Sequence, residues 1–308
     1  MSARRRACES PDIFCYHPAH MRKAVVLAAS AAFLAGCSSV TNHVAVLSTA
    51  DILTLGRGAT LDEPDYKLAH DAMPAQLKLV ETLIVSEPAD RNLRRLAAEG
   101  FAGGAFLFVE ETDPGRAKAL YLRGRDHALA ALALKSRFAG LADKPLDEFQ
   151  ETLRNATLDD VPDLFWAGMG WGGYVNLSKD DASALAELPK VTAMMTRVQE
   201  LDPSFHFAGA DMFFGVYYAS RPRILGGDPA KAKAAFERVT AATKGRYLMA
   251  HVLNARWYAV AVQDRELFKQ LLTKVLESPA GRLPESRLTD EAAKLRAGRL
   301  LEKIDDYF

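Results

Sequence analysis

Asp113-Pro-Gly-Arg-Ala-Lys-Ala-Leu-Tyr121 and Asp228-Pro-Ala-Lys-Ala-Lys-Ala-Ala-Phe236 are two similar stretches, and each predicts the start of a helix. Asp before a helix accepts hydrogen bonds from the free N–H groups of the first turn, and Pro suits the first helical position because it has no N–H to leave unpaired. An Ala and an aromatic residue follow four positions apart, on one face of the helix. This pattern is typical of the second helix in a tetratricopeptide-like (TPR-like) pair.

The residues upstream of the first stretch fit the first helix of such a pair. Aromatic and small residues occupy the positions where that helix needs them, at Phe101, Gly104, Ala105 and Phe108. Near the C-terminus the same spacing fits more loosely, and residues 221–227 lengthen the turn before the second stretch. We therefore predict an all-α fold, a TPR-like helical-repeat superhelix with degenerate repeats and about ten to twelve helices.

Capping residues and apolar side chains at helical spacing predict where the helices lie. No alternating β-branched run predicts a strand. The expected helices are 64–86, 92–110, 114–138, 147–154, 160–178, 181–201, 203–219, 229–243, 247–262, 264–277 and 285–307.

The N-terminal residues carry the most specific motif of the chain. Met21-Arg-Lys is a basic segment, residues 24–33 are a short apolar segment, and Leu34-Ala-Gly-Cys37 matches the lipobox at which bacterial lipoproteins are processed. The apolar run is too short to span a bilayer. We predict that the true start is Met21 and that Cys37 is lipidated, with acyl chains such as palmitate holding the protein to a membrane. The alternative is an ordinary signal or a buried helix with an incidental cysteine.

The predicted organisation has three parts: a leader with the lipoprotein signal peptide at 1–37, a tether at 38–60, and a TPR-like helical domain at 61–308. No cysteine follows Cys37, so the mature chain has no disulfide and no thiol-based metal site or nucleophile. Ser38-Ser39 stands where an Asp would favour retention in the inner membrane. We therefore expect a periplasmic protein anchored to the outer membrane.

Charge and motifs exclude several classes of function. Basic and acidic residues are equally numerous, 39 of each, which argues against nucleic-acid binding because that needs a basic face. The chain contains no metalloprotease, hydrolase, β-lactamase or phosphate-loop motif, and its seven histidines are scattered. We expect no enzymatic activity, no cofactor and no metal.

Some polar residues lie in apolar surroundings and leave two interpretations open. His206 lies between two phenylalanines and is either a satisfied core histidine or a catalytic or ligand residue. The charged residues Asp211, Arg221, Arg223 and Arg256 lie near apolar helices. They are either paired structural charges or the polar end of a ligand site.

One expected helix has an unusual composition. The stretch Phe165-Trp-Ala-Gly-Met-Gly-Trp-Gly-Gly-Tyr-Val-Asn-Leu177 has four glycines among large aromatic residues. Each Gly inside a helix costs roughly 1 kcal/mol relative to Ala, or about 3–4 kcal/mol in total. Either a very close helix contact or a cavity walled by the backbone would offset this cost. The stretch also matches G-x-G-x-x-G, but no strand precedes it, so we reject a dinucleotide site.

A second aromatic cluster, at 205–218, surrounds too much of its helix for a single buried stripe, so that helix is expected to be central. These aromatic residues either fill the core of the superhelix or form the wall of a hydrophobic pore or pocket. The candidate ligand-binding or pore-lining residues are Phe165, Trp166, Trp171, Tyr174, Phe213, Tyr217 and Tyr218.

Six ordered motifs between residue 96 and residue 268 resemble a known family. They are Leu96-Ala-Ala-Glu-Gly-Phe-Ala-Gly-Gly104, Tyr121-Leu-Arg-Gly-Arg-Asp126, Phe165-Trp-Ala-Gly168, Phe213-Phe-Gly-Val-Tyr-Tyr218, Gly226-Gly-Asp-Pro229 and Val262-Gln-Asp-Arg-Glu-Leu-Phe268. The chain from about residue 60 to its end resembles the T-component (TatT) lipoproteins of TRAP transporters.

The resemblance implies an all-helical, TPR-like periplasmic lipoprotein that forms a homotrimer with a hydrophobic pore through each protomer. It also implies that the protein pairs with the substrate-binding P component of a TRAP system and binds a hydrophobic or amphipathic small molecule. No catalytic residues carry over. Two functions therefore remain: a lipid-anchored accessory subunit of a solute transporter, or a TPR-type envelope scaffold that holds peptide segments without transporting a ligand.

Overall fold

Both repeated stretches begin helices in the computed structural model of the chain. They start α4 (Pro114–Ala133) and α10 (Pro229–Thr243), each with Pro in the first turn. Asp113 accepts a hydrogen bond from the third N–H after it at 2.9 Å, and Asp228 accepts two, at 3.0 and 3.1 Å. The small and aromatic residues that follow each cap are buried. The capping interpretation of the sequence is confirmed.

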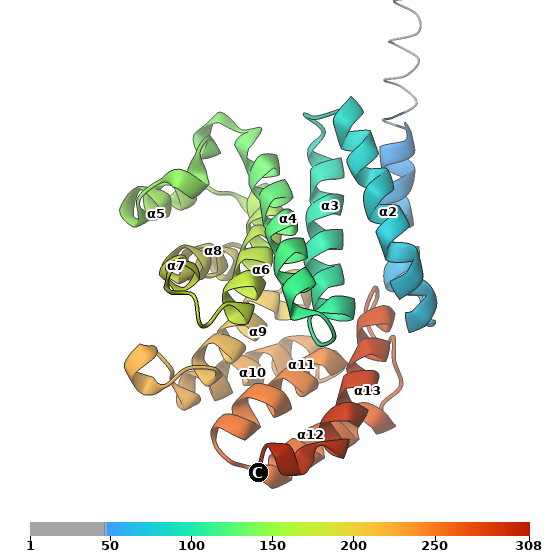
Figure 1. Cartoon of the computed structure of the whole chain (residues 1–308), viewed down its shortest axis with the longest axis vertical. Coiled ribbons are helices and arrows are strands. Elements are labelled where there is room, and N and C mark those ends of the chain that lie inside the picture. The colour runs from blue at the N-terminus through green and yellow to red at the C-terminus, as the bar shows by residue number, and fades with distance from the viewer. Residues whose placement is uncertain (1–45, 47) are drawn as a thin grey trace, which may run out of the picture. The chain divides into compact units, whose positions relative to one another are not determined.

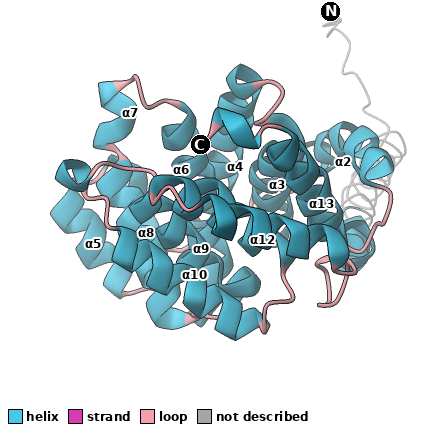
Figure 2. Ribbon diagram, turned by 90° about the horizontal axis from the view of Figure 1, so that it is seen from below, coloured by secondary structure: helices cyan, strands magenta, loops and turns pink. Residues whose placement is uncertain are grey.

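The structure describes residue 46 and residues 48–308, and the regular structure in that part is helical (Figures 1 and 2). This confirms the all-α prediction. The predicted leader, including Cys37, lies outside the described residues. A helix ending at residue 61 precedes α2 (Tyr66–Ser86), α3 (Arg91–Gly104), α4, α5 (Leu146–Arg154), α6 (Val161–Leu177), α7 (Ala182–Ala186), α8 (Leu188–Leu201), α9 (Phe205–Ala219), α10, α11 (Leu248–Leu253), α12 (Arg265–Glu277) and α13 (Arg287–Glu302).

The structure differs from the sequence predictions at residues 181–201 and in the predicted tether. The single helix expected at 181–201 is two helices, α7 and α8, and Pro189 lies in the first turn of α8. Proline in a first turn is tolerated, whereas in the middle of a longer helix it would remove a hydrogen bond and clash with the preceding turn. In the predicted tether, residues 49–60 belong to the helix that ends at residue 61.

Within the unit Thr49–Phe308 most helices pack against the next helix in the sequence or the next but one. The series runs from α2 on α3, through α3 on α4, α4 on α6 and α6 on α8, to α8 on α9 and α9 on α10. The last three helices pack together, and α13 also contacts α2 (Figure 1). This pairwise order is compatible with a TPR-like superhelix, and the contact of α13 with α2 brings the C-terminal end of the series back to its beginning.

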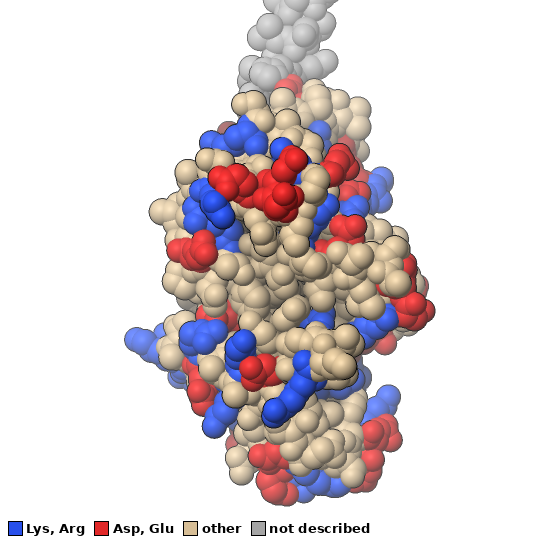
Figure 3. All heavy atoms as spheres, turned by 90° about the vertical axis from the view of Figure 1, so that its left-hand side faces the viewer, with Lys and Arg blue, Asp and Glu red and all other residues tan. Residues whose placement is uncertain are grey.

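Acidic and basic side chains are mixed on the face shown in Figure 3, as the equal numbers of the two charges would suggest. None of the helices in the described part of the chain combines the length and the hydropathy that a bilayer-spanning helix requires.

Candidate ligand cavity

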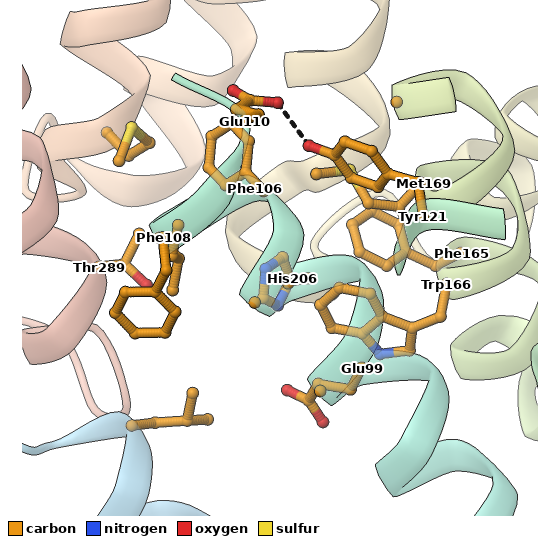
Figure 4. Close-up of a pocket in the computed structure, with 18 of the residues that line it drawn as sticks. Glu99, Phe106, Phe108, Glu110, Tyr121, Phe165, Trp166, Met169, His206 and Thr289 are labelled. Carbon is orange, nitrogen blue, oxygen red and sulfur yellow. Dashed lines mark hydrogen bonds between the residues drawn. The ribbon is translucent and has the colours of Figure 1, made fainter. Parts of the chain in front are cut away.

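A cavity of about 490 Å³ lies inside the unit 49–308 (Figure 4). Its walls come from the helix 49–61, α2, α3, α6, α9 and the segments that follow α3 and α11. Its size is within the range of about 300–1,000 Å³ that is usual for small-molecule sites. Aromatic and other apolar side chains predominate, among them Leu53, Met73, Leu77, Phe106, Phe108, Phe165, Trp166, Met169, Met212, Phe213, Tyr217, Tyr247, Met249 and Trp257.

The structure divides the seven candidate residues into two groups. Those that line the cavity are Phe165, Trp166, Phe213 and Tyr217. Those that are not among its lining residues are Trp171, Tyr174 and Tyr218. The Trp171 ring is buried and lies edge-on to the ring of Phe149, 6.4 Å between centroids, while Tyr218 stacks on Phe214 at 6.0 Å.

The sequence left two explanations for the glycines of α6, close helix contact and a cavity walled by the backbone, and both apply. A Cβ on Gly170 would lie 2.6 Å from the carbonyl oxygen of Tyr121 and 2.8 Å from the backbone nitrogen of Arg125, so this glycine lets α6 approach the backbone of α4. Gly172 and Gly173 instead line the cavity. Gly173 also lies against α4, since a Cβ there would be 2.5 Å from the Tyr121 ring, so close helix contact and a backbone cavity wall together offset the cost of glycine in α6.

Two π-helical segments supply lining residues that helical spacing alone did not identify. The first, Ala105–Val109, directly follows α3 and places Phe106, Leu107 and Phe108 on the wall. The second, Asn254–Ala259, directly follows α11 and contributes Trp257. A π-helical turn holds more residues than an α-helical turn, so it changes the direction of the side chains after it, and such segments are frequent at functional sites.

A left-handed turn at the start of α9 places His206 against the cavity. The φ angles of His206, Phe207 and Ala208 are 48°, 60° and 59°. This conformation costs roughly 1–2 kcal/mol for each residue that is not glycine. The imidazole centroid lies 5.1 Å from the ring of Phe165 and 5.0 Å from that of Trp166. Figure 4 shows it between Trp166 and Phe108.

The imidazole of His206 is a polar group on this apolar wall. Burial lowers its pKa to about 4, and the positive charge of Arg57 acts in the same direction, so the ring is neutral at pH 7. No described residue forms a hydrogen bond with the ring nitrogens. A neutral imidazole presents one N–H donor and one acceptor nitrogen. His206 can therefore offer a hydrogen bond to a molecule in the cavity.

A set of hydrogen-bonded side chains lies at another part of the cavity wall. The Tyr121 hydroxyl donates to Glu110 at 2.5 Å (Figure 4). A guanidinium nitrogen of Arg296 lies 3.5 Å from the same carboxylate. Arg296 also donates to the carbonyl oxygen of Phe106. Burial raises the pKa of Glu110, and the Arg296 charge opposes that rise. Because these groups satisfy one another, they join α4, α13 and the π-helical segment after α3 around the cavity.

Ion pairs hold the helix 49–61 over the cavity. The Nε atom of Arg57 lies 2.6 Å from a carboxylate oxygen of Glu99 on α3, and Arg57 also pairs with Glu285 before α13. Burial alone would lower the pKa of Arg57, but these two carboxylates raise it. This helix also carries the exposed apolar side chains Ile52 and Leu55, of which Ile52 lines the cavity. Among the described residues, no group of His, Cys, Asp and Glu side chains is arranged to hold a metal ion.

Sequence comparison relates this chain to a known protein family. The sequence model of a family described as TRAP transporter T-component matches residues 62–308, which includes every helix from α2 to α13. A curated protein of Treponema pallidum (strain Nichols), named "Uncharacterized protein", is 25% identical over 265 residues, which cover 80% of this chain and 81% of that protein. The family match extends over most of the chain and includes every cavity-forming helix except the helix 49–61, and on that evidence the chain belongs to the TRAP transporter T-component family.

Proposed function

We propose that the protein is a periplasmic accessory subunit of a TRAP-type transporter and that it holds a hydrophobic or amphipathic small molecule in the cavity. The observation that carries this proposal is the aromatic-walled cavity of about 490 Å³ in a chain of this family. Protein interiors normally contain few voids larger than a water molecule. The apolar wall of an open cavity stays in contact with water until an apolar molecule displaces that water, and removing apolar surface from water is favourable by about 25 cal/mol per Å². This gain favours a site built to be occupied.

The proposal includes a membrane anchor and partners. Lipidation of Cys37 holds the mature protein to a membrane, with Ser38 favouring the outer membrane, and residues 38–48 connect the anchor to the unit that contains the cavity. The substrate-binding P component of the transporter is the protein partner, and the assembly is a homotrimer. The lipobox motif supports the anchor, and membership of the family supports the association with a transporter.

The first test asks whether the cavity holds a molecule. Gly103 lines the cavity, and a Cβ there would meet the Trp166 ring only at an ordinary 3.8 Å, so Gly103→Leu would extend a side chain into the space without a backbone clash. Gly298→Leu is the matched control because a Cβ at Gly298 meets nothing within 4 Å. Mass spectrometry of extracts from the purified full chain should find a bound apolar molecule in wild type and Gly298→Leu, and much less in Gly103→Leu.

The second test addresses the transporter. A cognate P component should be captured by the wild-type chain, and solute uptake in cells should fall when Gly103→Leu replaces wild type but remain normal with Gly298→Leu. The scaffold alternative makes the opposite prediction, since a protein that only holds peptide segments needs no open cavity. No bound molecule in wild type, together with normal uptake in Gly103→Leu, would refute the proposal.

A further inference from the structure

We propose that Lys179, Arg221 and Arg256 form the polar end of the cavity and bind the carboxylate of an amphipathic organic acid whose apolar part lies among the aromatic walls. This inference rests on the proposed function, because it names the chemical class of the molecule that the cavity holds.

Three segments that are distant in the sequence bring these cations together. Lys179 follows α6, Arg221 follows α9, and Arg256 belongs to the π-helical segment after α11. The Nζ atom of Lys179 lies 4.9 Å from the centroid of the Trp257 ring, and the Cζ atom of Arg256 lies 5.1 Å from the same ring. The charges of Arg221 and Arg256 both act on Lys179, so the three side chains form one cluster.

The cluster is continuous with the apolar cavity. Arg221 is itself a lining residue, and its Cζ atom lies 4.2 Å from the centroid of the Tyr217 ring, which also lines the cavity. Trp257 is a third lining residue, and its ring contacts both Lys179 and Arg256, which are not lining residues themselves. A molecule with its apolar part against Tyr217 and Trp257 can therefore place an acidic group among the three cations.

The three cations form no ion pair with a described Asp or Glu side chain. Arg221 donates to the carbonyl oxygen of Tyr217 at 2.8 Å and lies 3.5 Å from the Ser220 hydroxyl. A guanidinium has five N–H donors, so several of its donors remain available for a ligand. Arg57, which lines another part of the cavity, differs from these three cations because it is paired with two carboxylates.

Arg221 and Arg256 are half-buried without a counter-ion, and the exposed Lys179 lies beside both of these positive charges, which is unfavourable. Burial lowers the pKa of Arg221, and it lowers the pKa of Lys179 together with the two neighbouring positive charges. A bound anion would relieve both the repulsion and the loss of hydration. A carboxylate suits this place because Arg offers a planar fork of donors to it and Lys adds a point charge. The adjoining apolar wall selects an acid with a sizeable hydrocarbon part.

The experiment compares two ligands that differ only in the polar group. The full chain, freed of bound lipid, is titrated with decanoate and with decanol, and binding is followed by calorimetry and by tryptophan fluorescence. Decanoate should bind more tightly than decanol by roughly tenfold or more, since hydrogen bonds to charged groups are the stronger kind. This preference should shrink as salt increases, because the cluster is partly exposed to solvent.

Substitutions test which side chains cause the preference for decanoate over decanol. Arg221→Gln and, independently, Lys179→Gln should each reduce decanoate affinity roughly tenfold while leaving decanol affinity unchanged. The control is Arg223→Gln, which removes an exposed cation two residues away that does not line the cavity. Lys179 is on the surface, so its variant keeps the test informative if Arg221→Gln does not fold.

The results of these titrations distinguish a failure of the carboxylate site from a failure of the proposed function. If both ligands bind equally and neither variant changes decanoate affinity, the carboxylate site is wrong while the apolar cavity remains a ligand site. If neither ligand binds, both proposals fail. If decyl phosphate binds wild type much more tightly than decanoate does, the assignment to a carboxylate is overturned.

Discussion

Replacing Gly170 with Ala should lower the free energy of unfolding by about 2 kcal/mol, although Ala is the better helix former. The new Cβ would lie 2.6 Å from the Tyr121 carbonyl oxygen, 2.8 Å from the Arg125 backbone nitrogen and 3.3 Å from the Arg125 Cα. All three are backbone atoms, so no flexible side chain can move aside and α6 must separate from α4. Overpacking of this kind costs about 1–3 kcal/mol, and we take the upper end because whole helices must shift. The gain in helix propensity offsets about 1 kcal/mol of that cost.

Gly298→Ala is the matched control for this substitution. Gly298 lies inside α13, where a Cβ would meet nothing within 4 Å, so only the propensity gain of about 1 kcal/mol applies. For a domain of this size, about 1 kcal/mol moves Tm by roughly 2–4 °C. Thermal unfolding followed by circular dichroism should show Tm about 4–8 °C lower for Gly170→Ala and about 2–4 °C higher for Gly298→Ala. The reasoning about close helix contact would be refuted if both variants were stabilised alike.

Three further predictions concern the cavity and its surroundings. Burial lowers the pKa of His206 to about 4, whereas the same histidine in the unfolded chain has a pKa of about 6.5. As pH falls from 6.5 to 4, the unfolded chain binds this proton and the folded chain does not, so up to about 3 kcal/mol of stability should be lost. Urea unfolding at stepped pH should show a smaller slope in His206→Asn than in wild type, and the slope that remains comes partly from His127 and His251, whose pKa values burial also lowers. Arg296→Met should cost about 3–5 kcal/mol by leaving Glu110 buried without its cation, and adding Glu110→Gln in a double-mutant cycle should recover part of that loss. Trp171→Ala should cost about 3–5 kcal/mol as a core truncation but leave decanoate binding unchanged, since Trp171 does not line the cavity; altered binding would contradict its placement.

Much of the fold followed from local patterns in the sequence. The caps at Asp113 and Asp228, the prolines that follow them and the spacing of apolar residues are signals within a few residues of one another. Such signals determine where a helix begins and ends because backbone hydrogen bonds in a helix join residues four apart. The glycine-rich composition of α6 likewise indicated that something unusual offsets its cost, without deciding between helix contact and cavity wall.

The cavity itself was decided by tertiary structure. Its walls combine residues from the helix 49–61 to α13, and its wall after α3 depends on a π-helical segment where sequence analysis assumed a continuous α-helix. The left-handed turn at 206–208 that orients His206 is not favoured by the local sequence.

The sequence by itself determined an all-helical chain, the approximate ends of its helices, a lipobox and a family resemblance, because each of these depends on residues close together or on ordered motifs. It could not separate Trp166, which lines the cavity, from Trp171, which fills the core, although both lie on α6. Their positions differ because α6 has neighbours on more than one side, and only the packing of α4, α8 and α9 around it decides which face of the helix meets a cavity.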